Sequence, residues 1–201
     1  MKQIILIFIK NPVEGNVKTR LAVTVGNAAS LSIYQSLLRH TQAITKELHA
    51  GKIVFYSDNV EDGDIWDDKI YKKKLQIGND LGERMKNAFE DTFEEGKNKV
   101  ILIGSDCLEL TPAIINEAFS ILQNKDLVVG PATDGGYYLI GMKKLHAPLF
   151  QNISWGSGDV LMQTLEAAVK QALTFYLLAE LSDLDNEEDL IAMKNKSLYS
   201  E

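Results

Sequence analysis

Short apolar segments rich in β-branched residues alternate along this chain with segments that have an amphipathic helical pattern. The apolar segments cover residues 2–9, 52–56, 99–104, 126–130, 137–142 and 173–178, and a further strand is expected within 69–77. Helical patterns follow Asn27, Asp80 and Thr111, and cover residues 157–170 and 187–193. This alternation predicts an α/β fold of three layers, in which a mostly parallel sheet carries helices on both faces.

Local signals refine this prediction. Asn27 is expected to cap a long helix, and Pro112 suits the first position of a helix that opens at Thr111. No helix separates residues 126–130 from residues 137–142, so the second of these strands is predicted to be antiparallel. The polar stretch 58–68 is expected to be a mobile loop, and Trp66 within it carries little information.

Length and charge limit the classes of protein to consider. A chain of 201 residues is long enough for one core, and we predict one domain, residues 1–201. The formal net charge of −7 gives no field for nucleic acid. Cys107 is the only cysteine, which excludes an intrachain disulfide, and no apolar run is long enough to span a bilayer. We therefore expect a cytoplasmic protein.

The first loop holds two cations close together. Gly15, Lys18 and Arg20 follow the first predicted strand. In open α/β sheets ligands bind beyond the carboxyl ends of the strands, and glycine with a lysine and an arginine suits a diphosphate. The glycine spacing is not that of a Walker loop. A solvated basic turn explains this loop, taken alone, equally well.

Carboxylates follow two other predicted strands. Asp106 stands at the end of strand 99–104, where it could bind Mg²⁺ through a nucleotide or cap the next turn. Cys107 is expected to be a packed residue. Asp183 and Asp185 follow the last strand and project the same way from an extended chain. They could complete a metal site, or they could be the acidic start of a helix capped by Asp185 or Asn186.

A glycine pair joins two predicted strands. Asp134, Gly135, Gly136 and Tyr137 lie in this connection. Paired glycines beside a carboxylate and an aromatic ring suit a surface that packs on a sugar or another acceptor. Asp-Gly is also a strong signal for a tight hairpin, and both interpretations can hold together. Trp155, at the start of a helix, is expected in the core or in a pocket wall.

Five motifs in sequence order carry a family resemblance. They are Lys-x-Pro-x-x-Gly-x-Val-Lys-Thr-Arg-Leu, Asp-Leu-Gly-Glu-Arg-Met, Gly-Ser-Asp-Cys, Gly-Pro-Ala-x-Asp-Gly-Gly-Tyr-Tyr and Asp-x-Asp-x-x-Glu-Asp-Leu, at residues 10–21, 80–85, 104–107, 130–138 and 183–190. Together they resemble the radical-SAM/selenodomain-associated transferases, which are described as glycosyltransferase-like. That family is similar in turn to phospholactate guanylyltransferases and molybdenum-cofactor nucleotidyltransferases. The resemblance implies a Rossmann-like GT-A fold, that of nucleotide-diphospho-sugar transferases.

The resemblance also implies roles for single residues. Gly15, Lys18 and Arg20 would hold phosphates, with Lys18, Arg20 and Asp106 in catalytic positions. Asp106 and Asp185 would bind Mg²⁺ or Mn²⁺, with Asp183 as the substitute for Asp185. The nucleobase would lie near Gln76 and Gly78, and the acceptor would face Asp134, Gly135, Gly136 and Tyr137.

The sequence departs from the family pattern at two positions. Leu108 stands where a proline is usual, and Asn186-Glu187 replace Thr-Pro in the closing motif. Neither change removes a carboxylate. Both changes are therefore expected to affect the rigidity of the two loops rather than their chemistry.

Two reactions fit these expectations. The chain could transfer a glycosyl group from a nucleotide sugar, or a nucleotidyl group from a nucleoside triphosphate to a small phosphorylated acceptor. A non-catalytic protein that binds a nucleotide or a partner is the rival of another class, and a homodimer stays open. A haloacid-type phosphatase would need Asp-x-Asp after the first strand, where Lys10-Asn11-Pro12 stands.

Overall fold

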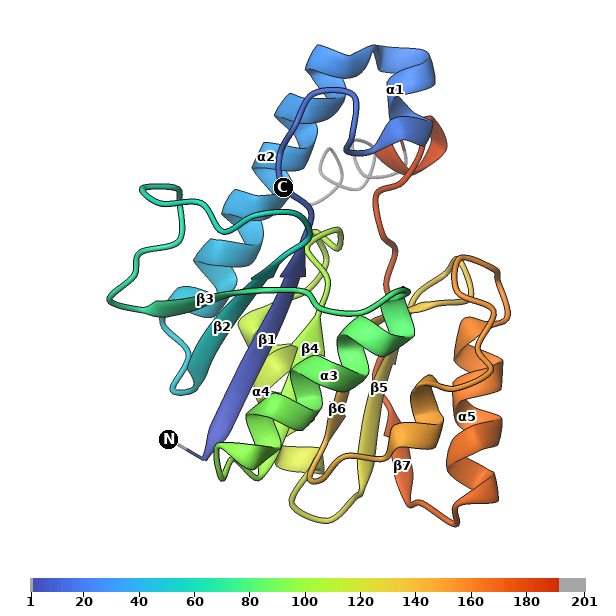
Figure 1. The fold of residues 1–201 in the computed structure, drawn as a ribbon. Helices are drawn as coiled ribbons and strands as arrows, with labels where there is room; N and C mark the ends of the chain where they lie inside the picture. The colour runs from blue at the N-terminus through green and yellow to red at the C-terminus, as the bar shows by residue number, and fades with distance from the viewer. Residues whose placement is uncertain (1, 192–201) are drawn as a thin grey trace.

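The computed structural model describes residues 2–191. A seven-stranded sheet runs through the centre of the molecule (Figure 1). The strands are β1 Gln3–Ile9, β2 Gly51–Tyr56, β3 Tyr71–Leu75, β4 Lys99–Ile103, β5 Leu127–Pro131, β6 Tyr137–Met142 and β7 Phe175–Leu177. Their order across the sheet is β3-β2-β1-β4-β6-β5-β7. Only β6 among these strands runs antiparallel to its neighbours, as expected for a strand joined to β5 by a hairpin.

Helices cover both faces of this sheet (Figure 1). They are α1 Thr19–Val25, α2 Asn27–Lys46, α3 Leu81–Glu94, α4 Pro112–Ile121 and α5 Val160–Lys170, with a 3₁₀ turn, η1, at Ala147–Phe150. α2 and α4 pack on one face, around side chains such as Ile7 and Ile101. α3, α5 and η1 pack on the other, around Leu6 and Phe89. None of the helices in residues 2–191 is both long and apolar enough to cross a membrane.

The predicted α/β architecture is confirmed, and so are two helix starts. Asp80 caps α3 by accepting a hydrogen bond from the amide of Glu83, and Thr111 caps α4 with Pro112 at its first position. The predicted cap at Asn27 is wrong: α2 begins there, but Gly26 is the capping residue and no side chain caps the helix.

Other boundaries also differ from the prediction. The seven-residue helix α1 lies in a stretch predicted to be a polar loop, and α5 starts at Val160 rather than at residue 157. The closing helix starts at residue 187 as predicted, after Asn186, whose side chain accepts a hydrogen bond from the Asp189 amide. Its predicted last residues, 192 and 193, lie outside the described part.

The loop at residues 58–68 is not the loosely held segment that its polar composition predicts. Trp66 is only 1% exposed and packs edge-on against Tyr71. The buried Asn11 side chain accepts a hydrogen bond from the Asp58 amide and donates one to the Asn59 carbonyl. A buried aromatic ring and a satisfied amide therefore fix this loop to the core and to the loop after β1.

Candidate active site at the carboxyl edge of the sheet

Four segments meet where β1 and β4 end side by side. They are the loop after β1, the loop after β4, the hairpin between β5 and β6 (residues 132–136, hereafter the hairpin) and the segment after β7. The chain leaves β1 towards α2 on one face and reaches β4 through α3 on the other. The crevice between two such strands is the usual ligand site of an open α/β sheet.

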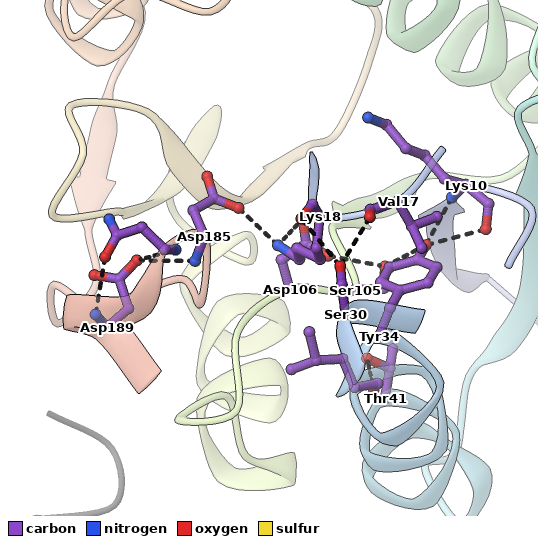
Figure 2. Close-up of polar contacts among 12 residues, drawn as sticks. Lys10, Val17, Lys18, Ser30, Tyr34, Thr41, Ser105, Asp106, Asp185 and Asp189 are labelled. Atoms are coloured by element: carbon purple, nitrogen blue, oxygen red, sulfur yellow. Dashed lines mark hydrogen bonds and ion pairs between the residues drawn. The ribbon is translucent and has the colours of Figure 1, made fainter. Parts of the chain in front are cut away.

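Lys18 joins two of the predicted carboxylates at this place. Its Nζ atom lies 3.0 Å from Asp106 Oδ2 and 2.7 Å from Asp185 Oδ1, as Figure 2 shows. The lysine side chain is 4% exposed, whereas the two carboxylates are 40% and 36% exposed. Burial lowers the pKa of Lys18, but the two carboxylates outweigh burial and the net pKa is raised. The ammonium group therefore stays charged.

The backbone of Lys18 has an unusual conformation. Its φ of 47° and ψ of 46° place it in the left-handed region, at the cap position of α1. A non-glycine residue in that region costs of order 1 kcal/mol and needs support from its surroundings. Ser30 supplies that support, because its hydroxyl contacts the carbonyls of both Val17 and Lys18 at 3.0 Å.

Tyr34 fixes the start of the same loop. Its hydroxyl accepts a hydrogen bond from the Lys10 amide at 2.8 Å and also contacts the Lys10 carbonyl and the Ser105 hydroxyl (Figure 2). Burial, together with the nearby charge of Asp106, raises the pKa of Tyr34, so the hydroxyl keeps its proton. The loops after β1 and β4 are thus joined beneath Lys18 by a side chain of α2.

The segment after β7 brings the acidic pair to Asp106. The amide of Leu184 donates to the carbonyl of Asp106, and the amide of Ser182 donates to Glu109. Leu184 is buried between the two aspartates, which fixes the register of the segment. Asp189 then accepts from the amide of Asp185, holding the next turn in place.

Negative charge exceeds positive charge around Lys18. Burial raises the pKa of Asp183 to about 7, and the carboxylates of Asp106 and Asp134 add to the rise while Lys18 opposes it. Oxygen donors with excess negative charge fit a hard divalent cation. Two carboxylates converge on Lys18, but no three acidic, imidazole or thiol side chains within residues 2–191 are grouped closely enough to hold a metal.

The loop between β3 and α3 (residues 76–80, hereafter the β3–α3 loop) contains two predicted base-binding residues. The Gln76 amide group donates to the carbonyls of Ile9 and Phe55, so its nitrogen ties the ends of β1 and β2 together. A β-carbon on Gly78 would lie 2.7 Å from the Arg84 amide, which leaves room for glycine only. Arg84 in turn donates to the Gly78 carbonyl. The loop is rigid, and its backbone lies directly on α3.

The hairpin holds the residues predicted to face an acceptor. Asp134 accepts from the Gly136 amide in a tight turn and is close enough to Asp183 to raise its pKa. Tyr137 is placed differently from its neighbours. Its ring packs among the apolar residues under α3, and its hydroxyl contacts Met85 Sδ at 3.9 Å. Tyr137 therefore packs in the core directly after the hairpin.

Gly15 and Arg20 lie at the rim of the site. Gly15 has a φ of 82°, which suits glycine, and both residues are exposed. Arg20 makes no hydrogen bond or ion pair with the part of the chain that the structure describes. The structure thus groups Lys18, Asp106, Asp183, Asp185 and Asp134, and leaves Arg20 free in solvent.

Sequence reasoning missed Ser30 and Tyr34. Both lie on the buried face of α2, one turn apart. The hydrophobic pattern could not reveal their role, because it does not register the hydroxyl groups through which both side chains act. Their only signal is a serine and a tyrosine at i and i+4 just before the apolar pair Leu37-Leu38.

Solved structures define the class of this fold. A proposed nucleotide-diphospho-sugar transferase from Desulfovibrio desulfuricans G20 is 33% identical, with a TM-score of 0.90 over 99% of this chain and 89% of that one. The inositol-1-phosphate CTP transferase of T. maritima (14% identity, TM-score 0.58, 98% and 94% covered) shares the fold. The same fold is found in 4-diphosphocytidyl-2C-methyl-D-erythritol synthase from Anaerococcus prevotii DSM 20548, with 8% identity and a TM-score of 0.63 over 98% of this chain and 96% of that one.

The chain has the α/β fold of nucleotide-diphospho-sugar transferases. It belongs to the family described as "Uncharacterized protein conserved in bacteria (DUF2064)", whose model matches residues 40–157. No curated protein matches it. The implied association with radical-SAM or selenium proteins is not addressed by these comparisons and stays a prediction.

Proposed function

We propose that this chain is a nucleotide-dependent transferase that binds the diphosphate part of a nucleotide sugar or a nucleoside triphosphate at Lys18, with the help of a divalent metal. The convergence of Lys18, Asp106 and Asp185 at the carboxyl edge carries the proposal. An ammonium has three N–H donors, and the described residues use two of those on Lys18. The third can donate to a phosphate oxygen.

Lys18 would act on the leaving group. Whether a nucleoside diphosphate leaves a sugar carbon or pyrophosphate leaves the α-phosphorus, negative charge grows on the departing phosphate oxygens. A fixed, buried ammonium stabilises such charge more than water does, because it needs no reorientation during the reaction. The left-handed backbone of Lys18 and the hydroxyls beneath it supply that fixed position.

The carboxylates would hold the metal. Asp106 and Asp185, which converge on Lys18, suit Mg²⁺ or Mn²⁺ in chemistry and in charge, with Asp183 as the next carboxylate along the chain. Because the described side chains do not form a group of three, phosphate oxygens of the ligand would supply further donors. When bound, the ion would neutralise phosphate oxygens and thereby help the leaving group depart. Asp134, on the hairpin beside Asp183, would face a small-molecule acceptor.

Two observations bear on the reaction class. The relative of 33% identity is described as a proposed nucleotide-diphospho-sugar transferase, which favours glycosyl transfer from a nucleotide sugar. Nucleotidyl transfer is the second candidate, because distant structures of the same fold include a CTP transferase. The site chemistry on this chain serves both reactions.

Ligand-induced stabilisation tests the proposal. Nucleotide sugars and nucleoside triphosphates are screened by thermal shift, with and without Mg²⁺, on the wild type, on Asp106→Asn and on Glu166→Gln. Glu166 lies on the exposed side of α5 and serves as the control. A ligand at a hundred times its Kd adds about 2.7 kcal/mol, which for this length is roughly 5–10 °C.

The pattern of shifts decides the outcome. We expect one ligand class to stabilise the wild type and Glu166→Gln in the presence of Mg²⁺, and Asp106→Asn to lose the shift. The released product, a nucleoside diphosphate or pyrophosphate, then separates glycosyl from nucleotidyl transfer. No shift with any nucleotide would overturn the proposal in favour of a partner-binding protein.

A further inference from the structure

Trp155 lies against the first turn of α3. A β-carbon placed on Gly82, the second residue of that helix, would lie 2.6 Å from two carbons of the indole ring and would overlap its nitrogen. The ring also packs among the apolar residues under α3 and α5. Gly82 is therefore a position where the helix backbone and the tryptophan touch without an intervening side chain.

A second close contact lies a few residues further along. A β-carbon on Gly135, in the hairpin, would lie 2.6 Å from the carbonyl carbon of Gly158 and closer still to its oxygen. The amide of Leu161 donates to the Gly135 carbonyl at 2.9 Å. Here two backbones touch directly, so the hairpin rests on the start of α5.

The short segment between these two contacts is braced. The amide of Ser154 donates to Gln163 Oε1 at 2.7 Å, and the Gln163 side chain also contacts the Ser154 hydroxyl. The Ser157 hydroxyl accepts from the Asp159 amide at 3.2 Å. Residues 153–159, hereafter the bridging loop, therefore contact α3 at Trp155 and the hairpin at Gly158, and hydrogen bonds brace the stretch between these contacts.

We infer that the bridging loop holds the β3–α3 loop and the hairpin in one fixed relation, and that Trp155 is a positioning residue for both. The inference rests on the proposed function for its meaning: the β3–α3 loop is the expected nucleotide side, and the hairpin is the expected acceptor side. Trp155 touches Gly82 in the first turn of α3, directly after the first of these segments. It reaches the second only through the bridging loop, at the Gly135–Gly158 contact.

This arrangement has a consequence for specificity. The β3–α3 loop and the hairpin are the two walls of the site. The distance between them is set by Trp155 and by the close contacts at Gly82, Gly135 and Gly158 rather than by a hinge. A change at Trp155 should therefore disturb the hairpin, which it does not touch, together with the helix turn that it does touch. A residue that only fills the core would not produce that paired response.

Hydrogen exchange on the full chain tests the paired response without any ligand. In Trp155→Ala we expect amides of residues 79–84 and of residues 132–136 to exchange about tenfold faster, with Trp155→Phe between this variant and wild type. Phe150→Leu is the matched control. Phe150 is buried in the same layer and contacts Phe89, which lies seven residues further along α3 than Gly82. It should lower protection evenly, with no preference for the hairpin.

The alternatives give different results. Faster exchange at residues 79–84 alone, or an even loss like that of Phe150→Leu, would overturn the inference and leave Trp155 as a packing residue. Nucleotide affinity adds a second measurement: Trp155→Ala should raise the Kd of a stabilising nucleotide about tenfold, and Phe150→Leu at equal loss of Tm should not. If the wild type binds no nucleotide, the proposed function fails, and the exchange pattern still decides on the bridging loop.

Discussion

Two buried lysines in the described residues, Lys18 and Lys73, each bridge a pair of aspartates. They differ in whether the polar atoms around them all have partners within the protein. Lys73, on β3, is 6% exposed and lies 2.9 Å from Asp64 and 3.0 Å from Asp68. Lys18 is 4% exposed and has the same kind of pair at 3.0 and 2.7 Å. Neither the distances nor the exposed fraction of the lysine side chain separates the two clusters.

Hydrogen-bond saturation does separate them. The third donor of Lys73 goes to the carbonyl of Glu61, and the second oxygen of Asp64 accepts from the Tyr56 hydroxyl. Around Lys73 the polar atoms are paired within the protein. Around Lys18 one donor is unused by the described residues, Asp183 adds negative charge, and the backbone is left-handed. A saturated cluster stabilises a fold, whereas an unsaturated and strained one is typical of a site that binds a ligand.

Lys18→Met should have the largest effect on function. Loss of one preorganised donor at a developing charge lowers the transfer rate by about 100- to 1,000-fold. The loss of stability should be small, because the two carboxylates are more than a third exposed and water can solvate them. Turnover and thermal unfolding measure the two effects.

The same variant tests the metal in the absence of nucleotide. Lys18 contacts one oxygen of each carboxylate, and its positive charge would repel a divalent cation bound to the same two side chains. Mn²⁺ alone, titrated by calorimetry, should therefore bind more tightly to Lys18→Met than to wild type. A fully active Lys18→Met protein, or one with unchanged Mn²⁺ binding, would remove Lys18 from the proposed site.

Lys73→Met should reverse this profile. Removing the cation leaves the charge of the largely buried Asp64 with only the Tyr56 hydroxyl and the Trp66 amide as donors. The expected cost is about 3 kcal/mol in the free energy of unfolding, or roughly 10 °C in Tm. Ligand affinity measured below the transition should equal that of the wild type. Equal losses of activity in Lys73→Met and Lys18→Met would mean that saturation does not distinguish the two clusters.

A pair of tyrosines gives a finer test of the same contrast. Tyr34→Phe removes the hydroxyl that joins the loops under Lys18, and Tyr71→Phe removes one that contacts Gln42 and Thr45 far from the site. Both hydroxyls are buried, so each variant should lose about 1–2 kcal/mol of stability in denaturant unfolding. Only Tyr34→Phe should also slow transfer, about tenfold. Equal kinetics in both variants would reduce Tyr34 to a packing role.

The contrast also explains what the sequence could predict. Strand segments and the starts of α3 and α4 depend on local patterns, and the carboxylates at strand ends follow from the parallel architecture. Saturation depends on partners far apart in the chain: Lys18 and Asp185 are separated by 167 positions, and Tyr34 and Ser105 by 71. No local pattern contains those pairings. For the same reason Trp66 looked like part of a mobile acidic loop.

Asp68→Asn should have the smallest effect on stability of the variants compared here. Asp68 is 71% exposed, and Lys73 keeps Asp64 and the Glu61 carbonyl as partners. A surface ion pair of this kind contributes about 0.5 kcal/mol or less, so Tm should move by no more than about 2 °C. Asp185→Asn, the equivalent change beside Lys18, should leave Tm almost as little altered but weaken nucleotide binding in Mg²⁺. If Asp185→Asn binds nucleotide as the wild type does, the Asp185 charge has no part in nucleotide binding, and the two lysine clusters are equivalent.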